Sequence, residues 1–341
     1  MKRIDGSEGG GQLLRWALAM SAVTGTSIEM TGIRGARETS GLRPQHVAAI
    51  ELLEGITDAT TRGVDVGSES SVFEPNRVRG GEYAVDIGTA GSIPLVFDTV
   101  LPLQADISES LSARVIGGTD VKWAPPIDYV RYVKCPTLAP FGYDIEVEVS
   151  SRGFYPAGGG EATLVLEPST PESIHLENRG SLEEVRIYSV ASVSLSDADV
   201  AERQAESAAT EVSKQVSVPI HTFEEYARSP SKGSSIVVVA VFEHGRSGFS
   251  SLGEPGKPAE TVGAEAVDRF EAFIDSEGAI DPHLADQLLS LLAVSGGSIT
   301  TTKTTPHIRT AIDLLETFDV EVTLETDTDP VSITVDSPLP R

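Results

Sequence analysis

The segment DGSEGGGQLLRWALAMSAVTG, residues 5–25, decides how this chain begins to fold. Three consecutive glycines allow a tight turn, and the residues after them repeat with the period of an amphipathic helix. Gly25 is typical of a residue that ends such a helix. The next segment, TSIEMTGI (26–33), predicts a strand. The apolar face of the predicted helix consists of Leu13, Leu14, Ala17, Leu18 and Met20.

The same mixture of helices and strands continues outward from this segment. A second helix is expected to begin near Pro44 and to end near Gly55, because proline is favoured in a first helical turn. AGSIPLVFDTVLPL (90–103) predicts a buried helix. Further strands are predicted at 82–87, 113–118, 144–150 and 163–168, and further helices at 281–297 and 307–318. The pattern indicates an α/β or α+β chain, and no internal repeat is visible in the sequence.

A polar stretch, STPESIHLENRGS (169–181), interrupts this pattern. A strand, a helix, two strands and another helix follow it, which predicts a small α/β unit set inside a larger domain. The predicted large domain is residues 1–177 plus 276–341, and the predicted insert is residues 178–275. Within the insert, GRSGFSSLGEPGKPAE (245–260) is rich in Gly, Pro and Ser and is expected to be a mobile loop.

The composition limits the class of protein. The 341 residues suffice for two cores, and 26 Lys+Arg against 51 Asp+Glu give a formal net charge of -25. Such a charge repels nucleic acid, unless the acids serve solvation in a very salty cytoplasm, where charges are screened within about 3 Å near 1 M salt. The acids are spread along the chain, which favours a halophilic source. The single cysteine, the lack of a membrane-spanning apolar run and the polar start together predict a cytoplasmic protein without a membrane segment.

Two segments could bind anions. In SEGGGQLLR, the glycines bring backbone N–H groups close to a helix start, Glu8 could hold a divalent metal, and Gln12 and Arg15 share one helical face. A tight turn into a helix is the alternative interpretation. In GIRGARETSGLRPQH (32–46), Arg34, Arg37 and Arg43 gather before Gln45 and His46. Arginine is the preferred bidentate binder of phosphate, so a phosphate site is favoured over a solvated loop.

Two helix starts near the C-terminus carry further candidates. Asp281 and Pro282 suit the start of a helix on which His283, Asp286 and Gln287 share the polar face. Thr305 can cap the next helix, which puts His307 in its first turn. The helix dipole keeps that imidazole neutral, and a neutral imidazole can attack phosphorus. From position alone, a solvated helix face and a structural histidine remain open for these residues.

Together and in this order, the motifs resemble the RNA 3'-terminal phosphate cyclase family. The matching strings are DGSEGGGQLLR, IRGARETSGLRPQH, IGTAGSIPLVFDTVLP, GGTDVKWAPPIDYV, SRGFYPAGGGEATL, LADQLL and TPHIRTAI, from Asp5 to Ala311. The resemblance implies an α+β fold, with a large domain of repeated βαβαββ-type units like those of enolpyruvyl transferases and a small inserted α/β domain. It also implies ATP-dependent closure of an RNA 3'-phosphate to a 2',3'-cyclic phosphodiester through an adenylated histidine, in a halophilic and archaeal-type member.

The resemblance also implies roles for single residues. His307 would be the nucleophile and Glu8 the contact of a divalent metal, Mg or Mn. The RNA with its 3'-phosphate end would be held by Arg15, Arg34, Arg37, Gln45 and His46. ATP would be contacted by Gln12, Asp98, Phe249, His283, Asp286 and Gln287.

Three positions depart from the pattern of the family. Asp98 stands where a glutamine is common near the adenine, His283 where an aromatic residue precedes LADQ, and Ala311 where an asparagine is common. The nucleophile is retained. The alternatives are a non-catalytic cyclase-like protein of ribosome biogenesis, which lacks the histidine, an enolpyruvyl transferase, and an adenylating role at RNA 5' ends.

Overall fold

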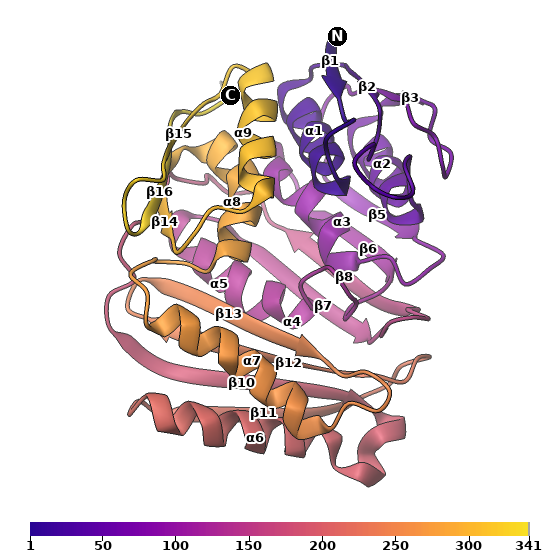
Figure 1. Cartoon of the computed structure of the whole chain (residues 1–341). Coiled ribbons are helices and arrows are strands. Elements are labelled where there is room, and N and C mark those ends of the chain that lie inside the picture. Colours follow the sequence, from indigo (N-terminus) through magenta and orange to yellow (C-terminus); the bar gives the residue numbers. More distant parts are fainter. Residues whose placement is uncertain (340–341) are drawn as a thin grey trace.

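The computed structural model describes residues 1–339, which form four mixed sheets of four strands each with helices between them (Figure 1). The α-helices are α1 (Gly11–Thr24), α2 (Pro44–Thr57), α3 (Ile93–Val100), α4 (Ile127–Tyr129), α5 (Cys135–Leu138), α6 (Val200–Gln215), α7 (Ala259–Ile274), α8 (Pro282–Ser295) and α9 (Pro306–Thr317). Three 3-10 helices, η1 (Leu101–Asp106), η3 (Ala139–Phe141) and η4 (Val193–Ala198), and one π-helix, η2 (Val130–Lys134), accompany them in the described residues. The mixed α+β class predicted from the sequence is confirmed.

Three of the sheets have the same connectivity. The first is β1 (Lys2–Asp5), β2 (Ile28–Thr31), β4 (Ser71–Glu74) and β3 (Thr60–Arg62) in spatial order. The second is β5 (Gly81–Asp86), β6 (Leu111–Gly117), β8 (Gly160–Leu166) and β7 (Ile145–Ser151). The third is β9 (Ile174–Leu176), β14 (Gly297–Thr301), β16 (Val331–Ser337) and β15 (Glu321–Glu325). In each sheet the first two strands are parallel and the other pairs antiparallel, which is a repeated βαβαββ order.

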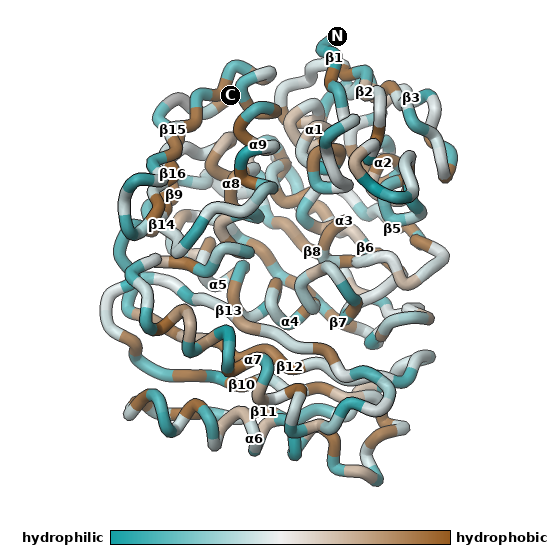
Figure 2. Tube along the Cα trace, viewed as in Figure 1, coloured by the Kyte–Doolittle hydropathy of each residue, from teal (hydrophilic) through white to brown (hydrophobic). Residues whose placement is uncertain are grey.

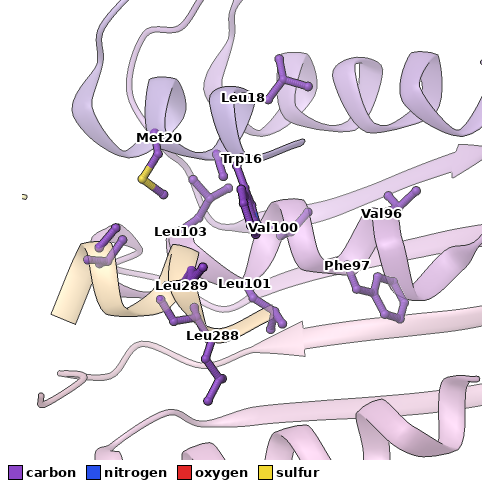
Figure 3. Close-up of a cluster of buried hydrophobic side chains, with 14 of the residues drawn as sticks. Trp16, Leu18, Met20, Val96, Phe97, Val100, Leu101, Leu103, Leu288 and Leu289 are labelled. Carbon is purple, nitrogen blue, oxygen red and sulfur yellow. The ribbon is translucent and has the colours of Figure 1, made fainter. Parts of the chain in front are cut away.

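The repeats meet through equivalent helices. α1, α3 and α8 each lie between the first and the second strand of a repeat in chain order, and their apolar faces form one core together with η1 (Figure 3). Trp16 and Met20 of α1 lie beside Val100 and Leu103 in this cluster, and Leu288 of α8 closes it (Figure 3). Because these helices pack on one another in a single core, the loops at their ends lie outside that core and can form a functional site.

The fourth sheet interrupts the third repeat between β9 and α8. It consists of β11 (Ile220–Ala227), β10 (Leu182–Ser192), β12 (Ser234–Phe242) and β13 (Gly245–Leu252) in spatial order. α6 and α7 pack against each other and against this sheet in the lower part of Figure 1.

The two cores touch along β12. Val237 and Val239 belong to the core of the three repeats, whereas Ile236 and Val238 face α6 and α7 in a second cluster. A strand buried on both faces explains the continuous apolar run at 236–242, visible as brown tube in Figure 2.

The prediction of a mobile loop at 245–260 is wrong for the first half of this segment. Residues 245–252 form β13, which pairs antiparallel with β12 from Phe242↔Gly245 to Ser235↔Leu252. The glycines that suggested a loop permit close packing instead, because a Cβ at Gly248 would lie 2.7 Å from the Tyr129 ring.

Within the described part of the chain, none of the helices has the length and apolarity needed to cross a membrane.

Candidate active site

The starts of four helices gather at one place. A Cβ at Gly11, the first residue of α1, would lie 2.3 Å from Nε2 of His46 in the first turn of α2. Gln45 accepts a hydrogen bond from the backbone N–H of Ser92, the N-cap of α3 (3.0 Å). The start of α9 is close too, because charges on the loop before α2 act on His307. Helix starts carry unpaired N–H groups and positive dipole ends, so this place favours an anion.

The triple glycine leaves α1 without a side-chain cap. Gly10 is the N-cap and makes no side-chain hydrogen bond, and the first turn of α1 has no acidic residue. A Cβ at Gly10 would lie 3.2 Å from Nη2 of Arg37. The glycines therefore keep the helix start open and admit a guanidinium and an imidazole beside it. The geometry leaves room for an anion beside this turn, and anion binding here stays a prediction from the sequence.

Two arginines of the site form no ion pair with the described residues 1–339. Arg15 is only 8% exposed, and burial lowers the pKa of its guanidinium to about 10, opposed by the charge of Asp98. It stays protonated at neutral pH. Within residues 1–339, neither Arg15 nor Arg37 has a side-chain hydrogen bond or ion pair, although the chain holds 51 acidic residues. A buried guanidinium such as that of Arg15 is costly without an ion pair unless an anion joins it, whereas Arg37 is exposed.

Arg34 shapes the loop before α2. Its Nη1 donates to the carbonyl oxygens of Thr39 (2.7 Å) and Gly41 (3.0 Å), which closes the loop on itself. Its backbone lies in the left-handed region, with φ at 57°. Burial and the neighbouring charges of Arg43 and Arg37 lower its pKa. Arg34 thus holds the loop that presents Arg37, while part of its guanidinium remains uncommitted.

His46 is a neutral hydrogen-bond donor. Its Nδ1 accepts from the backbone N–H of Arg43 (3.0 Å), which puts the proton on Nε2. That Nε2 is buried and has no partner among the described residues. Burial lowers the pKa of His46 to about 3, and the charges of Arg15, Arg34 and Arg43 act in the same direction. An unpartnered donor beside the Gly11 turn suits a phosphate oxygen.

His307 lies in the first turn of α9, as expected. Thr305 caps this helix by accepting from the backbone N–H groups of His307 (3.2 Å) and Ile308 (3.3 Å). His307 is half-buried, and its pKa is lowered by burial first and then by the charges of Arg37, Arg15 and His283. The imidazole is therefore neutral at pH 7 and can act as a nucleophile.

Asp286 holds the cap of the neighbouring helix. Its Oδ1 accepts from the Thr305 hydroxyl at 2.5 Å, and burial raises its pKa to about 7. The family resemblance implies a nucleoside contact for Asp286, and the contact with Thr305 was not predicted because the two residues lie 19 positions apart along the chain. The adjacent Gln287 has a buried Oε1 that lacks a hydrogen-bond partner among residues 1–339. This acceptor on α8 could bind a donor group of a ligand.

Asp98 is already occupied. Lys134 donates a hydrogen bond to its carboxylate. The side chain of Lys134 is 1% exposed and that of Asp98 is 13% exposed. The adenine contact predicted for Asp98 would share its carboxylate with this buried lysine. The sequence did not single out Lys134. The signal was a carboxylate in the apolar helix IPLVFDTV, which requires a basic or hydrogen-bonding partner.

The start of α8 is held by the inserted sheet. Asp281 caps it by accepting from the N–H groups of His283 and Leu284, both at 3.0 Å. Its second oxygen accepts from the Tyr129 hydroxyl (2.8 Å) and from the N–H of Gly248 in β13 (3.2 Å). His283 is exposed at this helix start.

Phe249 does not lie at the site. It follows Gly248 on β13, and successive side chains of a strand point to opposite faces. Its ring is 6% exposed and packs on Phe270 (5.9 Å between centroids) and Phe273 (5.4 Å). The base-stacking role predicted for Phe249 does not suit a ring that α7 covers.

Glu8 and Gln12 flank the glycine turn. Glu8 is exposed and Gln12 is half-buried in the first turn of α1. Within residues 1–339, no group of three or more His, Cys, Asp and Glu residues could hold a metal ion. Glu8 could therefore contribute a single carboxylate, which is enough only where the phosphates of a substrate supply the other ligands.

Comparisons with known proteins agree on one family. Residues 6–324 match the family model described as RNA 3'-terminal phosphate cyclase. The chain is 47% identical over 336 residues to the RNA 3'-terminal phosphate cyclase of Halobacterium salinarum, covering 95% of this chain and 97% of the relative. It is 42% identical to the protein of that name from Staphylothermus marinus (92% and 91% covered) and 40% identical to that of Pyrococcus furiosus (92% of both).

Proposed function

The chain belongs to the RNA 3'-terminal phosphate cyclase family, and we propose that it catalyses the ATP-dependent closure of an RNA 3'-phosphate to a 2',3'-cyclic phosphodiester. The observation that carries the proposal is a neutral histidine at a helix start, beside two guanidinium groups without acidic partners. The retained nucleophile disfavours a non-catalytic cyclase-like protein.

His307 begins the reaction. Its neutral imidazole attacks the α-phosphorus of ATP, an N–P bond forms, and pyrophosphate leaves. An oxygen of the RNA 3'-phosphate then attacks the same phosphorus and releases His307. Finally the adjacent 2'-hydroxyl attacks the RNA phosphorus, so that AMP leaves and the ring closes. The cap from Thr305 holds the backbone of His307 at the start of α9 during the first two steps.

Arg15, Arg37 and His46 hold the RNA end. The two guanidinium groups offset the charge of the 3'-phosphate so that one anion can attack another. The Nε2–H of His46 adds a neutral donor from α2, and its low pKa keeps this group a single donor across the working pH range. Gln45 ties the α2 start to the α3 start, and Arg34 supports the loop.

The nucleotide contacts come from α1 and α8. The unpartnered Oε1 of Gln287 suits an amino or hydroxyl donor of a nucleoside, so the residues present fit ATP. Gln12, His283 and Asp286 flank this place, and Asp98 contributes through its pair with Lys134. Glu8 would hold a divalent ion, Mg or Mn, together with the triphosphate. When bound, such an ion would neutralise phosphate charge and orient the leaving group.

The domain division forms part of the proposal. Residues 1–177 and 276–341 make the large domain of three βαβαββ repeats, as in enolpyruvyl transferases, and residues 178–275 make the inserted domain. The three identical sheet orders and the separate cluster around α6 and α7 support this division. The insert contacts the catalytic part through Gly248 and the Asp281 cap.

Labelling with α-labelled ATP tests the proposal. The protein is incubated at high salt with Mg²⁺ or Mn²⁺ and then examined for acid-labile label. The wild type is expected to be labelled, His307→Ala is not, and RNA with a 3'-phosphate discharges the label to a cyclic end. An unlabelled wild type contradicts the mechanism, and label that survives His307→Ala contradicts the assignment of the nucleophile. RNA with a 3'-hydroxyl is the matched control and should leave the label in place.

A further inference from the structure

Two aromatic rings stand exposed outside the residues assigned above. Trp123 is 88% exposed and Tyr155 is 45% exposed, and Trp123 is the most exposed large apolar side chain of the described residues. Their rings meet edge to face, with centroids 6.3 Å apart and planes at 83°. The ammonium of Lys122 lies 5.6 Å from the centroid of Tyr155. An exposed aromatic pair of this kind is typical of a binding surface.

The pair is fixed by a rigid base. The segments that carry it are joined by a bridge between Asp120 and Phe154, and the Tyr155 N–H donates to the Asp120 carbonyl (3.3 Å). Beneath them, the buried Arg152 binds both Asp120 and Asp128. Trp123 itself has φ at 63°, a left-handed conformation that tryptophan rarely adopts. Strain of this kind persists where the surroundings hold it, and it gathers at binding sites.

The pair lies one loop away from the proposed phosphate site. Trp123 sits between β6 and α4, the topological counterpart of the segment between β2 and α2 that carries Arg37. A Cβ at Gly158 would be 2.6 Å from Cα of Ala90, in the loop whose Ser92 N–H binds Gln45. The segment that carries Tyr155 therefore packs against the loop that is hydrogen-bonded to Gln45 at the proposed phosphate site.

We infer that Trp123 and Tyr155 form a stacking platform for a nucleobase of the RNA substrate, on the 5' side of the terminal phosphate. This inference rests on the proposed function. Every base has an apolar face that can stack on an aromatic side chain, so stacking tolerates any sequence. With a net charge of -25, the chain has few cations to offer the RNA backbone, and Lys122 is itself paired with Glu254 (3.2 Å). Stacking also survives the high salt that weakens phosphate contacts.

Intrinsic fluorescence and kinetics test the platform together. The chain has two tryptophans, and Trp16 is buried, so quenching by added RNA reports on Trp123. A short RNA with a 3'-phosphate is titrated without ATP, and KM for the same RNA is measured in cyclisation. Trp123→Ala is expected to raise KM roughly 10- to 100-fold, and Trp123→Phe only slightly. Phe223→Ala is the matched control, since this ring is also about half exposed and lies on β11.

An RNA series locates the stacked base. In RNAs with one abasic nucleotide, the wild type should lose affinity at a single position, and Trp123→Ala should lose none there. Equal KM values for Trp123→Ala and wild type would overturn the platform, as would a wild type whose fluorescence is unchanged by RNA. Loss of histidine labelling by ATP in Trp123→Ala would also overturn it, because the ring would then serve the nucleotide. A wild type that binds RNA with quenching but closes no end would instead refute the proposed function and keep the platform.

Discussion

Replacing Lys134 by methionine tests the buried pair beside the active site. The ammonium of Lys134 is hydrogen-bonded to Asp98, and both side chains are almost fully buried. Methionine fills a similar volume but leaves the carboxylate without its cation. Removing one partner of a buried ion pair costs about 3–5 kcal/mol, because an uncompensated charge remains inside. The charge of Asp98 also acts on Arg15, which can offset part of the loss, so we expect a cost near the lower end.

The partner substitution makes this prediction specific. Lys134→Met combined with Asp98→Leu removes both charges, and a pair replaced by apolar residues is often neutral for stability. Thermal unfolding at molar KCl is followed for the wild type, both single variants and the double variant. An unfolding entropy of about 2.1 cal/mol/K per residue over 341 residues gives about 1.4 °C for each kcal/mol, so Lys134→Met should melt roughly 4 °C or more below the wild type. The double variant should recover most of that loss. A double variant no more stable than Lys134→Met would refute the reasoning.

Three further predictions concern the site. Burial raises the pKa of Asp286 to about 7, so its charge opposes folding increasingly as pH rises from about 4 to 7; Asp286→Asn should therefore gain melting temperature over wild type above pH 7 and little near pH 4, and equal differences at both pH values would contradict this. Gly11→Ala should reduce RNA cyclisation roughly tenfold or more, because its Cβ would meet Nε2 of His46 at 2.3 Å. Gly55→Ala near the end of α2 serves as the glycine control and should keep the wild-type cyclisation rate, since its Cβ would meet no atom closer than the Tyr83 ring at 3.3 Å. Asp281→Ala should cost on the order of 2–4 kcal/mol in the free energy of unfolding, since it removes a helix cap and two further buried hydrogen bonds, and Asp281→Asn should retain part of the cap; denaturant unfolding that ranks the two variants equally would count against this.

Local signals predicted the helix starts correctly. Pro44, Asp281 and Thr305 lie where the sequence placed them, and Gly25 ends α1 with φ at 61°. These positions succeed because a cap bonds to backbone groups two or three residues away, so the information lies inside one short window. The first-turn position of His307 follows from the same reasoning.

The repeats are not visible in the sequence, because the three units have the same pattern of strand pairing but no residue pattern in common that can be recognised by eye. In the third sheet Ile174 pairs with Gly297 in parallel register, although the whole inserted sheet lies between these two residues along the chain. Such a pairing depends on which strands the cores bring together, and apolar spacing along the chain does not encode it. β13 was mistaken for a loop for a related reason. Its glycines and serines lack a strand signal, but β12 offers an edge and Tyr129 leaves room only for Gly248.

The contacts that tune the site were equally out of reach of local patterns. Asp286 is hydrogen-bonded to Thr305 because α8 and α9 pack side by side. Lys134 is hydrogen-bonded to Asp98 because α3 and η2 contribute to the same core. Each contact joins two helical segments of the same repeat. Sequence reasoning can state that a carboxylate in an apolar helix needs a partner, but the fold selects which one.

The acidic composition and an RNA substrate are compatible because they act over different distances. Elsewhere in the chain arginines find carboxylates, as in the pairs Arg3–Glu29 and Arg203–Glu260. At the helix starts Arg15 and Arg37 find none among residues 1–339, so the local charge is positive inside a chain of net charge -25. Near 1 M salt the Debye length is about 3 Å, which screens the distant acids but leaves a contact at hydrogen-bond distance almost intact. A phosphate at the site would therefore respond to the four helix starts and the two guanidinium groups, while the net charge governs solubility.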